Sequence, residues 1–138
     1  DDPRVDEVYG LHLTTLTPVG HVDVRPGASM ASCDYFEIDL VGKGGHGAMP
    51  HLSVDPMTAA ANIVLGLKHL VSHEVAAQET AVVTVGQIVC GTKGNIIPET
   101  ATMRGTIRTF ADGVRAQLKE RLMSEAWKPE SFARDANR

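Results

Sequence analysis

Apolar and polar residues alternate along residues 34–41, and this period of two predicts a half-buried strand. Its two faces would carry Phe36, Ile38 and Leu40 and, opposite them, Tyr35, Glu37 and Asp39. The glycine-rich stretch 42–47 follows and breaks regular structure around His46, because glycine tolerates backbone angles that other residues resist. The pattern therefore predicts a strand that runs into a turn carrying a histidine.

Two helices are predicted from apolar residues that recur every three or four positions. The first begins with Asp55 as N-cap and Pro56 at the first helical position. Its apolar residues are Met57, Ala60, Ala61, Val64, Leu67 and Val71. The second is capped by Asp112 and carries Val114, Leu118, Leu122 and Ala126, with Trp127 near its end.

Two further strands lie between these helices. Residues 80–90 are rich in β-branched side chains, and residues 98–109 alternate small or apolar residues with polar ones. The order strand, helix, strand, strand, helix matches an α+β, ferredoxin-like fold, in which two helices cover one face of an antiparallel sheet. The final strand of that fold is missing from the pattern, because residues 128–138 are too polar and too poor in β-formers.

The predicted elements divide the chain into three parts. Residues 1–33 precede the compact unit, residues 34–127 form it, and residues 128–138 are a polar tail. A short strand is expected at residues 19–25, ended by Pro26 and Gly27, and residues 8–30 are expected to belong to a different structural context.

The amino-acid composition excludes several classes of function for this chain. The chain has 138 residues, 43% of them hydrophobic, which suits one domain. Its 13 Lys and Arg against 17 Asp and Glu, with only 4% aromatic residues, argue against nucleic-acid binding, including an RNA-binding ferredoxin-like domain. No apolar run approaches the roughly 20 residues of a membrane span, and the first residues, DDPRVDEVYG, lack the basic-then-apolar order expected of an export signal. The two cysteines, Cys33 and Cys90, lack metal or disulfide spacing, so we predict a cytoplasmic protein.

Several polar residues are candidates for chemistry. His69 and His73 are four residues apart near a helix end, where they could bind a metal or interact with the negative end of the helix dipole. His46, between glycines, could approach another molecule closely or hold its own loop by a backbone hydrogen bond. Neither pair of alternatives is decided by the residues alone.

Asn95 and Arg108 each have a functional and a structural interpretation. Asn95 follows a glycine in a turn, where asparagine is common because it tolerates left-handed angles. Arg108 lies on the polar face of a strand, where its guanidinium could hold a carboxylate with two hydrogen bonds or could be an ordinary surface charge.

Three stretches together resemble one known family. They are GLHL, then VRPGASMASCDYFEIDLVGKGGHGAMPHLSVDPMTAAANIVLGL, then TVGQIVCGTKGNIIPETATMRGTIRTF. They are similar to the amidohydrolase branch of the aminoacylase and carboxypeptidase metallohydrolases, which includes hippurate hydrolases, N-acyl-amino-acid amidohydrolases and auxin-conjugate hydrolases. The resemblance covers roughly residues 8–122, and the motifs occur in the family's order.

The resemblance implies a division between two domains and a role for four residues. Residues 1–33 would be a piece of the catalytic domain and a linker, and residues 34–127 the ferredoxin-like lid through which these enzymes form homodimers. By the family pattern, His12 is a metal ligand. His46 would reach into the partner's active site and polarise the scissile carbonyl, while Asn95 and Arg108 would bind the substrate.

The resemblance also implies divalent metal ions, such as Zn, Mn, Co or Ni, in the complete enzyme. The family's other metal ligands and its catalytic glutamate have no matching positions in this chain. We therefore expect the chain to be a fragment of an enzyme that hydrolyses N-acyl amino acids, such as hippurate-like substrates, to bind no metal pair stably and to be inactive alone. The alternative is a dimerisation or scaffold module without catalysis.

Overall fold

A computed structural model of the chain describes residues 3–126 and the side chains as far as residue 124. The predictions for Trp127 and for the tail at 128–138 fall outside the described residues. The elements, in chain order, are β1 (Asp34–Val41), β2 (Gly45–His46), the 3-10 helix η1 (Pro50–Leu52), α1 (Pro56–Glu74), β3 (Ala81–Cys90), β4 (Ile96–Ile97), β5 (Thr100–Thr109) and α2 (Asp112–Ala126).

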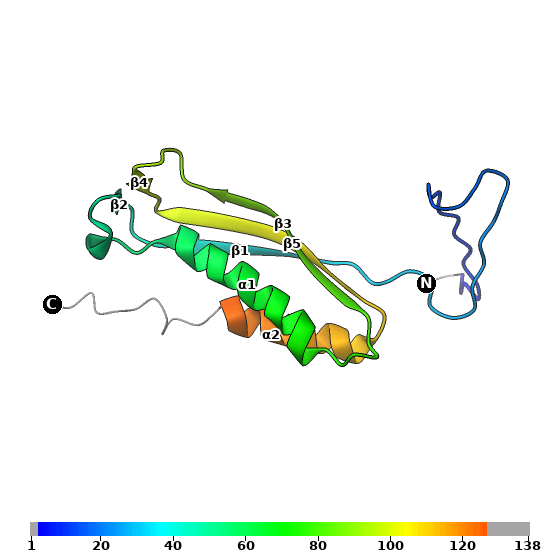
Figure 1. Cartoon of the computed structure of the whole chain (residues 1–138). Coiled ribbons are helices and arrows are strands. Elements are labelled where there is room, and N and C mark those ends of the chain that lie inside the picture. The colour runs from blue at the N-terminus through cyan, green and yellow to red at the C-terminus, as the bar shows by residue number, and fades with distance from the viewer. Residues whose placement is uncertain (1–2, 127–138) are drawn as a thin grey trace.

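The main sheet has the strand order β1-β5-β3, with antiparallel pairing throughout. Helices α1 and α2 lie together on one side of this sheet (Figure 1). The predicted α+β, ferredoxin-like fold is therefore confirmed, and within residues 3–126 the main sheet has three strands. A second, two-stranded sheet pairs β2 with β4, and the sequence did not predict it because two-residue strands leave no periodic pattern.

The core lies between the sheet and the two helices. Met103 on β5, Leu67 on α1 and Leu118 on α2 are all at most 1% exposed. These residues occupy apolar positions of the predicted periodic patterns. The face of each element that the pattern marks as apolar is therefore the face that packs into the core. The opposite sheet face carries the polar positions of β5, among them Arg104 and Arg108, and remains open within the described residues.

Gly105 shows why one position of the central strand has no side chain. A Cβ atom there would collide with the Thr84 carbonyl oxygen on β3 and with the Phe36 ring on β1. The register of β3 against β5 also shifts between Val85 and Gln87, at a bulge beside this contact. The close approach of three strands at this point therefore requires glycine.

Helix α1 begins as the sequence predicts. The Asp55 carboxylate accepts hydrogen bonds from the Met57 backbone N–H at 2.9 Å and from the Thr58 hydroxyl at 2.7 Å, and Pro56 occupies the first turn. Helix α2 differs by one residue, because Asp112 is its first residue rather than its cap. In that first turn its carboxylate still interacts favourably with the helix dipole.

An ion-pair cluster joins β1 to α2. The Arg115 guanidinium donates two hydrogen bonds of 2.6 Å to the Asp34 carboxylate, and the Lys119 ammonium lies 2.9 Å from the same group. The hydrogen bonds from Arg115 and then from Lys119 hold the pKa of Asp34 well below its ordinary value. This cluster was not predicted, because Asp34 and Arg115 are 81 residues apart and no local pattern links them.

Residues 3–31 contain no helix or strand, so the strand expected at residues 19–25 is wrong. Val22 and Val24 are 74% and 89% exposed, and no neighbouring strand within the described residues pairs with this segment. The backbone N–H and C=O groups of a strand must pair with a neighbouring strand. Alternating apolar and polar residues do not show whether such a neighbour is present. The segment joins the sheet through the Ser32 N–H, which donates to the Thr109 carbonyl at 2.8 Å.

The described helices include none with the length and apolar character required to cross a membrane.

Candidate functional site

The histidine-bearing turn lies at the end of the sheet where β1 finishes and β5 begins (Figure 1). Here β2 pairs with β4, so that His46 is opposite Ile96, and the Gly47 N–H donates to the Asn95 carbonyl at 2.9 Å. The structure therefore brings two of the predicted site residues, His46 and Asn95, together. They come from segments separated by the whole of α1 and β3.

The two interpretations of His46 are compatible in the structure. Its Nδ1 atom lies 3.1 Å from the Ala48 backbone nitrogen, which can only donate, so Nδ1 is the acceptor. In the neutral ring the proton then belongs to Nε2. The side chain is exposed, so one ring nitrogen fixes the turn while the other remains available as a donor to a second molecule.

Two glycines allow this turn to pack tightly. A Cβ on Gly47 would lie 2.9 Å from the Asn95 carbonyl oxygen, and a Cβ on Gly45 would collide with the Ser53 hydroxyl. The Ser53 oxygen is buried and has no hydrogen-bond partner among the described residues. His46 is therefore held by close contacts on both sides of the turn, which fixes the position from which its ring extends.

A hollow of about 590 Å³ opens beside His46. It is lined by Lys43, Gly44, Gly45, His46, Ile96, Ile97, Pro98 and Glu99. Its lining combines the apolar residues Ile96 and Ile97 of β4 with Lys43 and Glu99, which carry opposite charges. This composition suits a small molecule that has both an apolar part and a polar part.

Arg108 lies at the opposite end of β5. Eight residue steps separate it from Thr100, and at about 3.4 Å for each step the two positions are about 27 Å apart. Its side chain is exposed, and within residues 3–126 it makes no hydrogen bond or ion pair. The structure therefore does not bring Arg108 near His46 and Asn95 within one chain.

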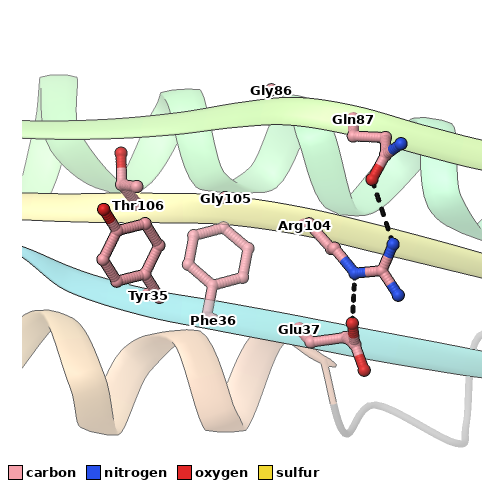
Figure 2. Close-up of a pocket in the computed structure, with 8 residues that line it drawn as sticks. All are labelled: Tyr35, Phe36, Glu37, Gly86, Gln87, Arg104, Gly105 and Thr106. Atoms are coloured by element: carbon pink, nitrogen blue, oxygen red, sulfur yellow. Dashed lines mark hydrogen bonds and ion pairs between the residues drawn. The ribbon is translucent and has the colours of Figure 1, made fainter.

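A second hollow, of about 540 Å³, lies on the open face of the main sheet (Figure 2). It is lined by Tyr35, Phe36, Glu37, Gly86, Gln87, Arg104, Gly105 and Thr106. The Arg104 guanidinium crosses it, held by the Glu37 carboxylate on one side and by the Gln87 amide oxygen at 3.1 Å on the other. These two bonds join β5 to both neighbouring strands, so Arg104 stabilises the sheet, whereas Arg108 makes no such bond within residues 3–126.

His12 lies on the N-terminal segment and is exposed, with Nδ1 2.6 Å from the Leu13 carbonyl oxygen. Within residues 3–126, no three or more His, Cys, Asp or Glu side chains gather in a way that could hold a metal ion. A hydrolytic metal pair needs several protein ligands, so the described residues do not form one by themselves.

Residues 33–130 match the family model described as a peptidase dimerisation domain. This chain belongs to that family. Among curated proteins, this chain is 41% identical over 118 residues to an N-acetylcysteine deacetylase of Bacillus subtilis, an alignment that covers 86% of this chain and 31% of that protein. It is 39% identical over 119 residues to IAA-amino acid hydrolase ILR1-like 4 of Arabidopsis thaliana, covering 86% and 27%.

Solved structures agree with the fold of the dimerisation domain. A structure described as an aminohydrolase from methicillin-resistant Staphylococcus aureus superposes with a TM-score of 0.70 at 30% identity, covering 73% of this chain and 27% of that one. The aminobenzoyl-glutamate utilization protein of Klebsiella pneumoniae shares the fold with a TM-score of 0.59 at 24% identity, covering 70% and 24%. The chain spans about a third of the length of the curated relatives that it matches.

Proposed function

We propose that this chain is the lid and dimerisation domain of a metal-dependent amidohydrolase that cleaves the amide bond of N-acyl amino acids. The named relatives support the substrate class, since one removes an acetyl group from N-acetylcysteine and another acts on amino-acid conjugates of IAA. Hippurate-like compounds belong to the same chemical class. The observation that carries the proposal is the exposed His46 ring, whose Nδ1 is occupied by its own turn and whose Nε2 is free to donate.

His46 supplies a hydrogen bond to the scissile carbonyl. When water adds to an amide, negative charge develops on the carbonyl oxygen, and a fixed N–H donor stabilises that charge. The tight turn fixes the ring in advance, so little reorganisation is needed during the reaction. Removal of one such donor typically lowers kcat by about 10²–10³-fold.

Arg108 binds the carboxylate of the amino-acid part. Its guanidinium has no partner within residues 3–126, and its planar fork fits a carboxylate through two parallel hydrogen bonds. Asn95, beside His46, contributes amide groups that orient the substrate near the carbonyl.

The separation of these groups makes a second copy necessary. The His46 turn lies at the Thr100 end of β5, and an N-acyl amino acid is far shorter than the roughly 27 Å from Thr100 to Arg108. One substrate can therefore contact both only if His46 and Asn95 come from one copy and Arg108 from the other. In a two-fold homodimer this exchange occurs twice, so each copy serves both sites.

The outer surface of α1 and the adjacent edge of β3 are suited to this second copy. Met57, Ala61 and Leu65 recur every four residues on the exposed side of α1, and Leu65 is 68% exposed. Ile88 on β3 is 46% exposed at the nearby edge of the sheet. A continuous apolar stripe beside an unpaired strand edge favours association with another protein surface.

The metal ions implied by the resemblance do not fit the described residues, because His12 belongs to no group of three or more metal-ligating side chains there. We derive no reaction step through a metal from this chain. On this proposal the domain positions the carbonyl and the carboxylate of the substrate, and alone it is inactive.

A chimera tests the proposal. The dimerisation domain of the Bacillus subtilis N-acetylcysteine deacetylase is replaced by residues 33–130 of this chain, and hydrolysis of a panel of N-acyl amino acids is measured. We expect an active chimera whose kcat falls about 10²–10³-fold on His46→Ala. Metal content should stay unchanged, and His51→Ala, a nearby exposed histidine, should leave kcat unchanged.

A stand-alone dimerisation module is the alternative, favoured by the lack of any cluster of three or more metal-ligating side chains within residues 3–126. It predicts that the chain forms dimers while His46→Ala has no effect on the chimera. Full activity in the His46→Ala chimera would therefore reject the catalytic proposal and leave the module as the better explanation.

A further inference from the structure

A pair of histidines lies on the exposed side of α1, away from the His46 turn. His69 and His73 are one helical turn apart, with ring centroids separated by 4.0 Å and ring planes tilted by 32°. Both side chains are exposed. The function proposed above gives neither residue a role in substrate binding, although both continue the four-residue spacing of Met57, Ala61 and Leu65 along α1.

The geometry of the pair is close to that of a chelate. Imidazole nitrogens bind transition metals at about 2.0–2.1 Å, and two rings bound side by side to one ion have centroids about 4–5 Å apart. The observed centroid separation of 4.0 Å falls within this range, and to bind one ion the rings must rotate until one nitrogen of each points at it. The helix backbone need not move.

The neighbouring charged groups on the same turns of α1 are engaged elsewhere. The Lys68 ammonium donates to the Val83 carbonyl on β3 at 3.1 Å. The Glu74 carboxylate accepts two hydrogen bonds of 2.6 Å from Arg121 on α2. The pair also lies near the C-terminal end of α1, where the helix dipole favours a positive charge.

We propose that His69 and His73 form a surface site that chelates one divalent transition-metal ion, with Cu²⁺ bound most tightly and Ni²⁺ next. The described residues provide no third His, Cys, Asp or Glu ligand, so water fills the other coordination positions. Tetragonal Cu²⁺ and Ni²⁺ accept such a site, whereas protein Zn²⁺ sites use three or four protein ligands. Mg²⁺ and Ca²⁺ prefer oxygen ligands and do not compete.

The test is a titration of the purified 138-residue chain with Cu²⁺. Binding is measured by calorimetry and by the visible absorption of nitrogen-bound Cu²⁺. We expect one tight site whose affinity falls by about tenfold or more in the double variant His69→Ala/His73→Ala. Each single variant should lose nearly as much, because one remaining imidazole cannot chelate. The matched control is His21→Ala/His51→Ala, which also removes two exposed histidines and should bind as the wild type does.

Alanine favours helix, so the variants should keep α1, which circular dichroism checks. As a second readout, Ni²⁺ should raise the Tm of the wild type and of the control but not of the His69/His73 variant, while Mg²⁺ should change neither. Equal Cu²⁺ affinity in the wild type and in the His69/His73 variant would overturn the proposal. Equal losses in the two double variants would also overturn it, because the binding would then be that of scattered histidines. In either case the pair would only interact with the helix dipole.

Discussion

The two ends of β5 differ in how they present a functional side chain. At the Thr100 end, His46 lies on a short turn fixed by a two-stranded sheet, by glycine contacts and by its own Nδ1 hydrogen bond. At the other end, Arg108 extends from a regular strand and has no partner within residues 3–126. His46, the proposed carbonyl-binding group, is therefore held rigidly, whereas Arg108, the proposed carboxylate-binding group, keeps its side-chain freedom. The central strand sets the distance between them.

Mixing two inactive chimeras should produce the largest effect. The experiment tests whether the two ends of β5 in one copy serve different active sites of the dimer. His46→Ala and Arg108→Ala chimeras are each expected to be at least about 10²-fold impaired. In a mixed dimer, one site receives His46 from one copy and Arg108 from the other, so co-refolding should restore about a quarter of wild-type activity. Activity that stays at the level of the single variants would show that both groups act within one copy.

Gly105→Ala tests how far the tight packing around β5 stabilises this strand, which sets the distance between His46 and Arg108. The new Cβ would collide with the Thr84 carbonyl and the Phe36 ring, so we expect a loss of about 1–3 kcal/mol in the free energy of unfolding. Urea unfolding of the 138-residue chain measures it. Gly113→Ala is the matched control, because a Cβ there meets nothing within 4 Å, and it should be nearly neutral.

Leu65→Glu tests the proposed surface for the second copy. Burial of a leucine stabilises an interface by up to about 1.5–3 kcal/mol, so a charge at this position should shift the chain toward monomer. Light scattering after size exclusion, across a range of concentrations, follows the shift. Met123→Glu on α2 is the matched control, since Met123 is 70% exposed against 68% for Leu65. An equal shift in both variants would argue against the α1 surface.

Asp34→Asn should have the smallest effect, confined to acid stability. The folded-state pKa of Asp34 is lowered, chiefly by the Arg115 hydrogen bonds, so the carboxylate stabilises the fold above its unfolded pKa of about 3.9. That stabilisation is lost as pH falls below this value toward the folded-state pKa. The difference in unfolding free energy between the wild type and Asp34→Asn should therefore shrink at low pH, which urea unfolding at several pH values measures.

The regular elements could be predicted because their pattern is local. The strand at residues 34–41 agrees residue for residue with β1, and the capping by Asp55 agrees with the start of α1. The strand expected at residues 19–25 failed, because pairing depends on a partner that alternation does not reveal. The β2–β4 pair and the Asp34–Arg115 contact depend on segments far apart in the sequence, for which a single sequence carries no signal.

For the candidate site, the residue types indicated which chemical groups could take part but not how these groups are arranged in space. The glycines around His46 indicated a close approach, and the structure shows the contacts that require them. That Asn95 lies beside His46 and that Arg108 lies far away follow only from the antiparallel register of β1, β5 and β4. The division into domains and the roles of His12, His46, Asn95 and Arg108 remain predictions.

The unpaired edges of the main sheet also affect how the chain assembles. Within residues 3–126, β1 and β3 each pair with β5 on one side only. The β3 edge is interrupted by its bulge and by Lys68, which occupies the Val83 carbonyl, whereas β1 is regular over all eight residues. Pairing at one edge closes a dimer, but simultaneous pairing at both edges would add copies without limit. If the proposed dimer uses the α1 surface and the β3 edge, the free β1 edges would then join dimers into ribbons in concentrated solutions, unless another strand occupies that position.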